Sequence, residues 1–238
     1  MNMQKLYEGK AKVVFATDDP EVYFVHFKDD ATAFDGTKRG TVGGKGYCNA
    51  HISDLAFRYL EQAGVSTHLI ELKPPTDMLV RKVKILPVEV VMRNVAAGSL
   101  TKRLGIPEGT ELPFAVLEHF YKCDELHDPL MNEDHIRAMG LATPEQMANV
   151  NAQARQINEL LQQFFGKADL ILVDFKLEFG LDSQGRVLLA DEISPDTCRL
   201  WDRETRTKLD KDRFRRDLGG VEEAYQEVLR RLRVAHGG

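Results

Sequence analysis

The sequence predicts an α+β protein with two lobes built mostly from antiparallel sheets. Up to residue 95, short apolar and β-branched runs are separated by turn residues, and one helical pattern interrupts them. A longer helical pattern and a charged hairpin dominate the rest of the chain. We therefore expect an N-terminal lobe at residues 1–84 and a C-terminal lobe at residues 85–238, with a ligand site in the cleft between them.

The composition is that of a soluble globular protein and limits the possible functions. The 238 residues are 43% hydrophobic and 29% charged, and no apolar run approaches the roughly 18 residues of a membrane span. The N-terminus, "MNMQKLYEGKAK", carries charges before any apolar block, so we expect no secretory signal and a cytoplasmic protein. The net charge of −5 disfavours a nucleic-acid partner. Three widely spaced cysteines offer neither a disulfide framework nor a CxxC zinc site.

The N-terminal elements are predicted to be strands around a single helix. "KVVFATDDPEVYFVHF" predicts two strands joined by a turn at residues 18–20, and a glycine-rich stretch follows at residues 34–49. Apolar residues then return at helical spacing from Tyr47 to Gly64, where glycine can end the helix. "STHLIEL", "DMLVRKV" and "LPVEVVMRN" predict three further strands.

The clearest helix of the sequence spans residues 143–166. Thr143 and Gln146 have the spacing of a capping box, and Pro144 suits the first turn. A single apolar stripe along this helix predicts that it packs against the core. The stripe consists of Met147, Val150, Ala154, Ile157, Leu161 and Phe164. A last helix is predicted from Val221 to Arg233.

A hairpin at residues 170–196, "LILVDFKLEFGLDSQGRVLLADEISPD", carries charges in the middle of apolar strands. Residues two apart in a strand share a face, so Asp174, Lys176 and Glu178 point one way. The opposite face, directed at the core, holds Val173, Phe175, Leu177 and Phe179. The charged face is either a solvated sheet surface with cross-strand ion pairs or part of a binding site.

The pairing of the two hairpin strands is left open by the sequence. If Gly180 pairs with Val187, Lys176 faces Asp191. A slip of one residue places Glu192 on that face instead. In either case, gathered carboxylates repel one another unless a cation lies among them, and Mg²⁺ prefers carboxylate oxygens together with phosphate and water.

Further polar groups could complete a metal–phosphate site. "SPDTCR" adds Ser194, Asp196 and Arg199 just after the second hairpin strand. The sequence lacks a complete Walker A pattern, but "EGKAKVVF" places two lysines on a small-residue turn directly before a strand. Such a turn could lie over a triphosphate, although the same letters occur in many soluble proteins.

"LPVEVVMRNVAAGSL" adds a second candidate for binding anions. Glu89, Val91 and Arg93 share one strand face, and Val88, Val90 and Met92 share the other. The strand then leads into a tight turn that can start a helix at Ser99, where free N–H groups, a hydroxyl and Arg93 suit an anionic oxygen. A capped helix without a ligand is the competing interpretation.

Five stretches together resemble the SAICAR synthetase family (phosphoribosylaminoimidazole-succinocarboxamide synthases) of de novo purine synthesis. They are "LYEGKAK", "LPVEVVMRNVAAGSL", "LILVDFKLEFG", "DEISPDTCRLWD" and "DKDRFRRDLGG". These stretches occur in the order and spacing of the family and cover essentially the whole chain.

The resemblance implies an ATP-dependent ligase. The family joins the carboxylate of CAIR (5-amino-1-(5-phospho-D-ribosyl)imidazole-4-carboxylate) to the amine of L-aspartate, using ATP and Mg²⁺ and giving SAICAR, ADP and phosphate. The implied fold is similar to the nucleotide-binding lobes of ATP-grasp and kinase-like proteins, and the implied assembly is a homodimer. The alternatives are a small-molecule kinase with the same nucleotide lobe and a non-catalytic nucleotide-binding module.

The resemblance also implies roles for individual residues by motif position. The expected catalytic residues are Lys176, Asp174 and Arg199. The residues expected to contact ATP are Lys10, Ala11, Lys12, Lys82, Glu178 and Asp191. Glu178 and Asp191 are the expected metal-linked acids, which favours Asp191 over Glu192. The residues expected to hold the anionic groups of CAIR are Arg93, Ser99, Asp196, Arg199 and Arg215.

Overall fold

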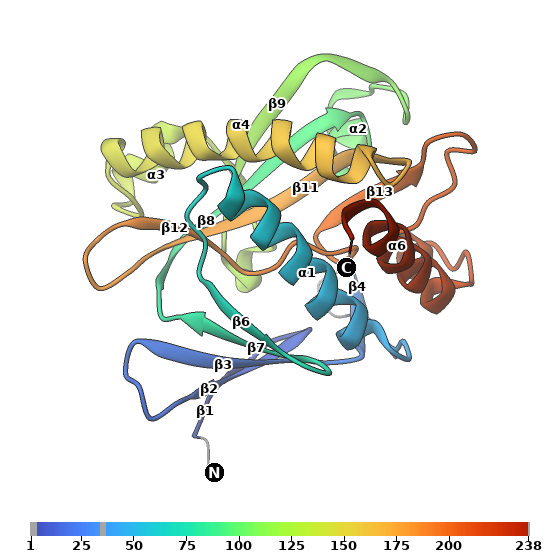
Figure 1. Ribbon diagram of the computed structural model, residues 1–238. Coiled ribbons are helices and arrows are strands. Elements are labelled where there is room, and N and C mark those ends of the chain that lie inside the picture. Colours follow the sequence, from blue (N-terminus) through green and yellow to red (C-terminus); the bar gives the residue numbers. More distant parts are fainter. Residues whose placement is uncertain (1–3, 34–36, 238) are drawn as a thin grey trace.

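The structure of the protein is a computed structural model that describes residues 4–33 and 37–237. The start of the predicted glycine-rich stretch, residues 34–36, lies outside these ranges. Two large sheets and a small hairpin contain the strands, and within each of them neighbouring strands are antiparallel (Figure 1). A parallel bridge between Thr67 and Leu189 connects the two halves of the molecule. The mixed, mostly antiparallel fold class predicted from the sequence is therefore confirmed.

The N-terminal sheet has five strands in the order β1-β2-β3-β7-β6. Their bounds are β1 (Lys5–Glu8), β2 (Lys12–Ala16), β3 (Val22–Phe27), β6 (Leu69–Lys73) and β7 (Asp77–Arg81). A separate hairpin consists of β4 (Asp30–Ala33) and β5 (Lys38–Thr41). The predicted strands of this half are all present, and β1, β4 and β5 are additional to them.

The C-terminal sheet has six strands in the order β10-β9-β8-β11-β12, with β13 paired to β11. Their bounds are β8 (Lys84–Val95), β9 (Glu111–Tyr121), β10 (Leu130–Met131), β11 (Leu170–Leu181), β12 (Val187–Ala190) and β13 (Cys198–Asp202). Sequence analysis did not predict β9, β10 or β13. The pairing of β8 with β11 places the two strands with predicted charged faces side by side.

The helices surround these sheets (Figure 1). Their bounds are α1 (Lys45–Gln62), α2 (Ser99–Leu104), α3 (Glu133–Ala138), α4 (Pro144–Gly166), α5 (Asp212–Arg215) and α6 (Val221–His236), with a 3₁₀ turn at Asp124–Leu126. The α4 helix lies across the C-terminal sheet and contacts β8 and β11, whereas α1 contacts α4, α6 and strands of the N-terminal sheet. In the described part of the chain, no helix combines the length and apolarity needed to cross a membrane.

The α4 helix forms as its sequence predicts. The Thr143 hydroxyl accepts a hydrogen bond from the Gln146 N–H at 3.2 Å, and the Gln146 side chain accepts one from the Thr143 N–H at 2.9 Å. All six residues of the predicted stripe are buried in the hydrophobic core. The capping box therefore starts the helix, and the stripe attaches it to the sheet.

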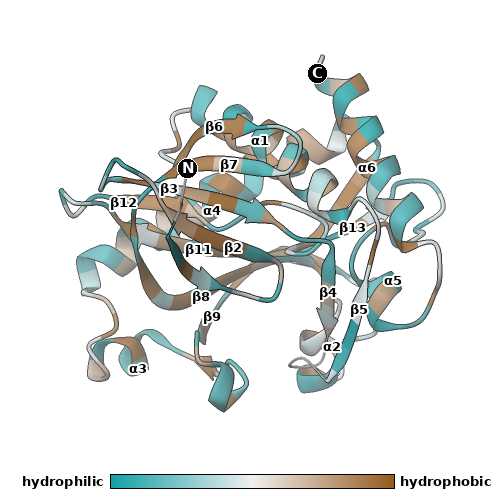
Figure 2. Cartoon of the chain, turned by 90° about the horizontal axis from the view of Figure 1, so that it is seen from below, coloured by the Kyte–Doolittle hydropathy of each residue, from teal (hydrophilic) through white to brown (hydrophobic). Residues whose placement is uncertain are grey.

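One continuous hydrophobic core joins both large sheets. It includes Phe27 and Met78 from the N-terminal sheet together with Val90 and Phe175 from the C-terminal sheet. Figure 2 shows hydrophobic residues concentrated on the central strands and hydrophilic residues on the outer loops. The two sheets are connected through residues 82–83, but because the core is shared, a domain boundary between residues 84 and 85 stays a prediction.

Alternation places the β8 and β11 side chains as predicted, except at Val173. Phe175, Leu177 and Phe179 are buried in the main core, as are the predicted apolar residues of β8. A bulge between Leu172 and Asp174 interrupts the β11–β13 pairing, and Val173 packs instead in a small separate cluster with Val95, Ala97 and Trp201. The prediction that Val173 shares the core face is wrong because the bulge adds a residue to that stretch of the strand.

Candidate active site

The charged faces of β8 and β11 meet on one side of the C-terminal sheet. The register pairs Asp174 with Arg93 and Glu178 with Glu89. The first pair joins opposite charges, whereas the second places two carboxylates directly opposite each other. Like charges at such positions are destabilising unless cations lie between them. The site therefore depends on nearby lysines.

Three lysines neutralise these carboxylates and form what we call the lysine–carboxylate cluster. It comprises Lys12, Glu89, Lys122, Lys176, Glu178, Asp191 and Glu192. The Lys176 ammonium donates to Glu178 and lies 3.4 Å from Glu89 and 3.2 Å from Asp191. Lys122 donates to Glu178 at 2.8 Å. Lys12 reaches across from the N-terminal sheet and donates to Asp191.

Asp191 joins this cluster through an unusual backbone conformation. Gly180 pairs with Leu188, and Glu178 pairs with Ala190, so the register that would pair Gly180 with Val187 is wrong. Regular continuation of the observed register would place Glu192 on the charged face. However, β12 ends at Ala190 and Asp191 has a φ of 61°, in the left-handed region. This turn directs the Asp191 carboxylate to Lys12 and Lys176.

Glu192 is also present at the cluster. Its carboxylate lies 3.7 Å from the Lys12 ammonium, and its side chain is buried. Burial raises the pKa of Glu192 from its ordinary value. Asp191 and Glu192, which the sequence left as alternatives, therefore both lie close to the Lys12 ammonium. Their pKa values are shifted in opposite directions, since that of Asp191 is lowered.

The electrostatics of the cluster keep the two central lysines and Asp191 charged. Burial alone would lower the pKa of Lys12 and of Lys176, but neighbouring carboxylates, Asp191 above all, raise both values above normal. Burial alone would raise the pKa of Asp191, but Lys12 and Lys176 hold it well below its usual range. The pKa of Glu89 is raised, mainly by burial.

A second set of polar and charged residues, the arginine cluster, is centred on Asp174, on the charged face of β8 and β11. It comprises Arg93, Ser99, Glu118, Asp174, Arg199, Asp212 and Arg215. Arg93 donates to Asp174 at 2.7 Å, to Glu118 at 2.6 Å and to the Ser99 hydroxyl at 3.0 Å. Arg199 donates to Asp174 and to Asp212, both at 3.0 Å.

Gly98 allows the arginine cluster to pack against the turn before α2. Its φ is +59°, and a Cβ at this position would lie 2.6 Å from a guanidinium nitrogen of Arg199. The Arg199 side chain is held by Asp174 and Asp212 and cannot easily move away. Only glycine therefore fits between this turn and the guanidinium.

Asp196 is held from two helices. Its Oδ2 accepts a hydrogen bond from the Lys45 ammonium at 2.7 Å, and its Oδ1 accepts one from the Tyr225 hydroxyl at 2.6 Å. The Lys45 and Asp196 side chains are 1% and 4% exposed. The residue expected to contact CAIR is thus already engaged through both oxygens by α1 and α6.

Three residues expected to contact ATP make contacts with residues outside these clusters. Lys10 pairs with the exposed Asp124 at 2.9 Å. The Ala11 carbonyl accepts a hydrogen bond from the Lys28 N–H at 2.8 Å. Lys82 follows β7, and its ammonium lies 5.9 Å from the centre of the Tyr23 ring. Of the "GKAK" turn, Lys12 reaches the lysine–carboxylate cluster, and the nucleotide contacts of the other residues stay predictions.

Several charged or polar residues of the site were missed by sequence analysis. They are Lys45, Glu118, Lys122, Asp212 and Tyr225. Lys122 and Glu118 belong to the β9 region, which was not predicted, and the others come from distant elements. Asp212 stands in the quoted stretch "DKDRFRRDLGG" without an assigned role, and the other four lie outside the quoted stretches, so only the fold identifies them as site residues.

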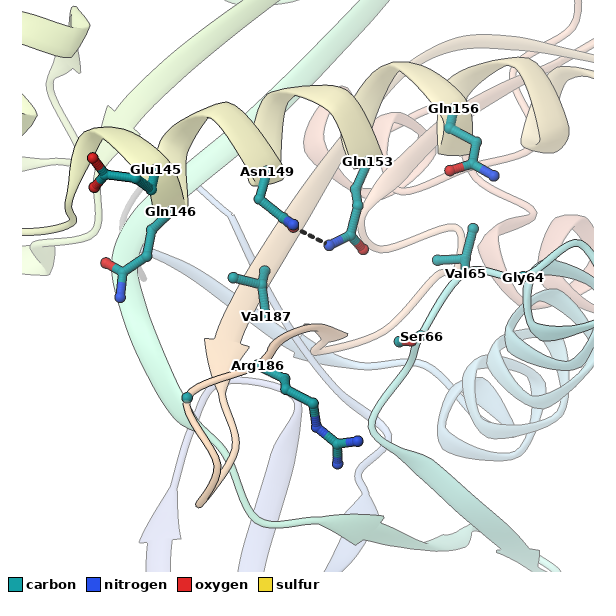
Figure 3. Close-up of a pocket in the computed structure, with 11 residues that line it drawn as sticks. Gly64, Val65, Ser66, Glu145, Gln146, Asn149, Gln153, Gln156, Arg186 and Val187 are labelled. Carbon is teal, nitrogen blue, oxygen red and sulfur yellow. Dashed lines mark hydrogen bonds between the residues drawn. The ribbon is translucent and has the colours of Figure 1, made fainter.

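A pocket elsewhere on the molecule contains none of these residues. It has a volume of about 470 Å³ and lies between α4, the β11–β12 turn and residues 64–66 (Figure 3). Four of its eleven lining residues are amides of α4, and two of these, Asn149 and Gln153, are hydrogen-bonded to each other. The charged clusters, rather than this pocket, hold the groups that suit phosphate chemistry.

The arginine cluster predicts a pH dependence of stability. Burial alone would raise the pKa of Asp212, but Arg199 and Arg215 lower it to about 2, from 3.8. Asp212 therefore stabilises the folded state above pH 4, and this contribution of about 2 kcal/mol is lost as the pH falls from 4 to 2. In urea unfolding, Asp212→Asn should lose less stability than the parent between pH 5 and pH 3. Equal slopes for the two proteins would contradict this prediction.

Comparisons with known proteins identify the family of the chain. The family profile of SAICAR synthetase matches residues 5–232. A phosphoribosylaminoimidazole-succinocarboxamide synthase of Coprothermobacter proteolyticus is 56% identical over 95% of this chain and 96% of its own. The crystal structure of the synthase from Ehrlichia chaffeensis superimposes with a TM-score of 0.94, at 45% identity, over 96% of this chain and 98% of that one.

A further solved structure, described as a SAICAR synthetase in complex with ADP, has a TM-score of 0.92 and 49% identity. It covers 95% of this chain and 96% of its own. The similarity therefore extends over both lobes and over every element that carries the charged clusters. The chain belongs to the SAICAR synthetase family.

Proposed function

We propose that this protein joins CAIR to L-aspartate at the expense of ATP, giving SAICAR, ADP and phosphate in purine synthesis. Family membership over nearly the whole chain supports the reaction. The structural observation that carries it is the meeting of the lysine–carboxylate cluster and the arginine cluster on one face of β11. One cluster suits a polyphosphate and the other suits the anionic groups of a ribotide.

The lysine–carboxylate cluster is the proposed site of the ATP phosphates. Lys12 and Lys176 stay protonated. Once a metal ion also binds their carboxylate partners, the two ammonium groups can neutralise phosphate oxygens. We assign residues 1–84 to ATP binding, with Lys10, Ala11 and Lys82 as further contacts, and residues 85–238 to substrate and metal binding. A structure in complex with ADP from the same family supports the use of a nucleotide.

The residues of the cluster also fit Mg²⁺. Glu178 and Asp191 both direct oxygens at the Lys176 ammonium, so their carboxylates already converge on one cation. Among residues 4–33 and 37–237, no group of three His, Cys, Asp or Glu side chains could hold a metal alone. Mg²⁺ commonly binds through one or two carboxylates and takes its remaining ligands from phosphate and water. Glu178 and Asp191 would hold the ion, which would neutralise charge on the phosphates.

The arginine cluster is the proposed site of CAIR. Arg93, Arg199 and Arg215 present guanidinium groups that suit phosphate and carboxylate oxygens, with the Ser99 hydroxyl beside them. Asp174 orients two of these guanidinium groups, at 2.7 Å and 3.0 Å. Lys45 and Tyr225 already bind the oxygens of Asp196. We therefore propose that Asp196 contributes by fixing the loop between β12 and β13.

The chemistry follows from the need to activate a carboxylate. A carboxylate is a poor acyl donor because oxide cannot leave. Its oxygen therefore attacks the γ-phosphorus of ATP, the bond to ADP breaks, and an acyl phosphate forms. The aspartate nitrogen then attacks the acyl carbon and loses a proton, while phosphate leaves with the electrons of the C–O bond. Catalysis by this chain is positioning and charge neutralisation, with no covalent enzyme intermediate.

A coupled ADP-release assay tests the proposed function. We expect steady-state release of ADP only when ATP, CAIR and L-aspartate are all present, and none when any one is omitted. Sustained release without aspartate would favour a small-molecule kinase. A phosphorylated side chain trapped during turnover would contradict direct transfer to the substrate.

We also propose that the protein works as a homodimer in the cytoplasm. The assembly is an expectation from the family, and light scattering coupled to gel filtration measures it directly. A mass of twice that of the chain is expected, and a monomer at working concentrations would contradict it.

A further inference from the structure

Lys211 occupies a rigid position next to the arginine cluster. It is the N-cap residue of α5, and its N–H donates to the Pro195 carbonyl at 3.0 Å. The preceding residue, Asp210, is fully buried and accepts hydrogen bonds from the N–H groups of Leu200 and Asp212 at 2.9 Å and 2.7 Å. These bonds fix the backbone of Lys211 against the loop that carries Asp196 and leads into β13.

The Lys211 ammonium lacks a partner despite this setting. Within the described part of the chain it makes no hydrogen bond and no ion pair. Its electrostatic neighbours are Asp196, Arg215, Lys45 and Glu192. Asp196 is the strongest of the favourable charges, but its two oxygens are bound by Lys45 and by Tyr225. The surrounding arrangement therefore leaves Lys211 as an unsatisfied cation.

This arrangement is unfavourable for the protein alone. Burial lowers the pKa of Lys211 from its ordinary value, and the positive charges of Arg215 and Lys45 lower it further. A partly buried cation that lacks an acceptor costs free energy. By contrast, Arg93, Arg199 and Arg215 all have carboxylate partners. A ligand that brings an anionic oxygen would remove the cost at Lys211.

The neighbours of Lys211 also locate that ligand. Glu192 belongs to the lysine–carboxylate cluster, and Arg215 belongs to the arginine cluster. The Lys211 N–H donates to the carbonyl of Pro195, three residues after Glu192. The next residue along the chain is Asp212 of the arginine cluster, so the Lys211 backbone lies between the two clusters. Because the acyl phosphate must form between the nucleotide and CAIR, this is the region that the reacting groups share.

We propose that Lys211 is a substrate-binding residue that donates to an anionic oxygen of CAIR or of L-aspartate. The inference rests on the proposed function and adds to it a residue of the stretch "DKDRFRRDLGG" to which no role was assigned above. Phosphate and carboxylate oxygens offer the same chemistry to an ammonium, so the two substrates must be separated by kinetics.

Steady-state kinetics of Lys211→Gln, Lys211→Arg and Lys208→Gln provide the test. Lys208 is a matched control, because its ammonium is already paired with Glu108 at 3.1 Å and lies over the Trp201 ring. In Lys211→Gln, the KM for CAIR or for L-aspartate should rise at least about tenfold, with the KM for ATP changed less than about twofold. The substrate whose KM rises is the one that Lys211 contacts. Lys211→Arg should recover part of the loss, and Lys208→Gln should match the parent.

Two further measurements keep the result interpretable. Thermal unfolding of Lys211→Gln should show a midpoint no lower than that of the parent, because the Lys211 ammonium makes no hydrogen bond or ion pair with the described residues and its charge is unfavourable there. Unchanged KM values for both CAIR and L-aspartate, or an equal rise for all three substrates, would overturn the proposal for Lys211. Failure of the parent protein to release ADP with all substrates present would instead overturn the proposed function.

Discussion

Replacing Asp191 with asparagine is expected to lower the turnover number at least about 100-fold while leaving the fold intact. Asparagine keeps the shape of the side chain and tolerates a left-handed backbone, so the φ of 61° is not a source of strain. What the variant loses is the negative charge that balances Lys12 and Lys176. Lys176→Ala should have an effect of similar size, because it removes the ammonium at the centre of the same cluster.

Asp169→Asn is the matched control for this experiment. Asp169 also has a left-handed backbone, with a φ of 54°, but it is exposed and pairs only with Arg203 at the surface. Steady-state turnover and circular dichroism of all three variants separate loss of chemistry from loss of structure. Near-normal turnover in both Asp191→Asn and Lys176→Ala would mean that the catalytic site lies elsewhere.

Arg93→Ala is expected to destabilise the protein by about 3–5 kcal/mol, the typical cost of breaking a buried ion pair. The Arg93 side chain is 4% exposed and pairs with Asp174 and Glu118, so its removal leaves buried carboxylates without their cation. Urea unfolding followed by the fluorescence of Trp201 measures this, because that buried residue is the single tryptophan. The KM for CAIR should rise as well, since a guanidinium of its site is lost.

Arg103→Ala provides the comparison, because Arg103 pairs with the same Glu118 from a more exposed position, at 30% exposure. Its removal should cost less than about 1 kcal/mol. If the two variants lose the same stability, the buried pairs of Arg93 are not important for folding.

Alternation along strands was enough to predict the charged faces of β8 and β11. In an antiparallel pair, neighbouring side chains alternate strictly, so the core face and the charged face follow from the spacing of residues such as Leu177 and Glu178. The same rule failed at Val173 and at Asp191. A bulge and a left-handed residue break the alternation there, and both depend on pairing with β13 and β12 rather than on local sequence.

The partners of the motif residues were beyond the reach of sequence analysis. Asp196 could be recognised in "SPDTCR", but Lys45 and Tyr225 approach it from helices that are distant along the chain. Likewise, Lys122 follows a strand that was not predicted and reaches Glu178 only through the sheet order. Motif positions predict which residues gather at a site, whereas the fold determines which of them remain available to a ligand.

A crystal of the protein grown with Mn²⁺ in place of Mg²⁺ and with a non-hydrolysable ATP analogue tests the central claim most directly. Anomalous scattering would locate the ion, and difference density would locate the triphosphate. The ion is expected between the carboxylates of Glu178 and Asp191, with the phosphates beside Lys12 and Lys176. An ion and a triphosphate bound away from the β11–β12 hairpin would contradict this account.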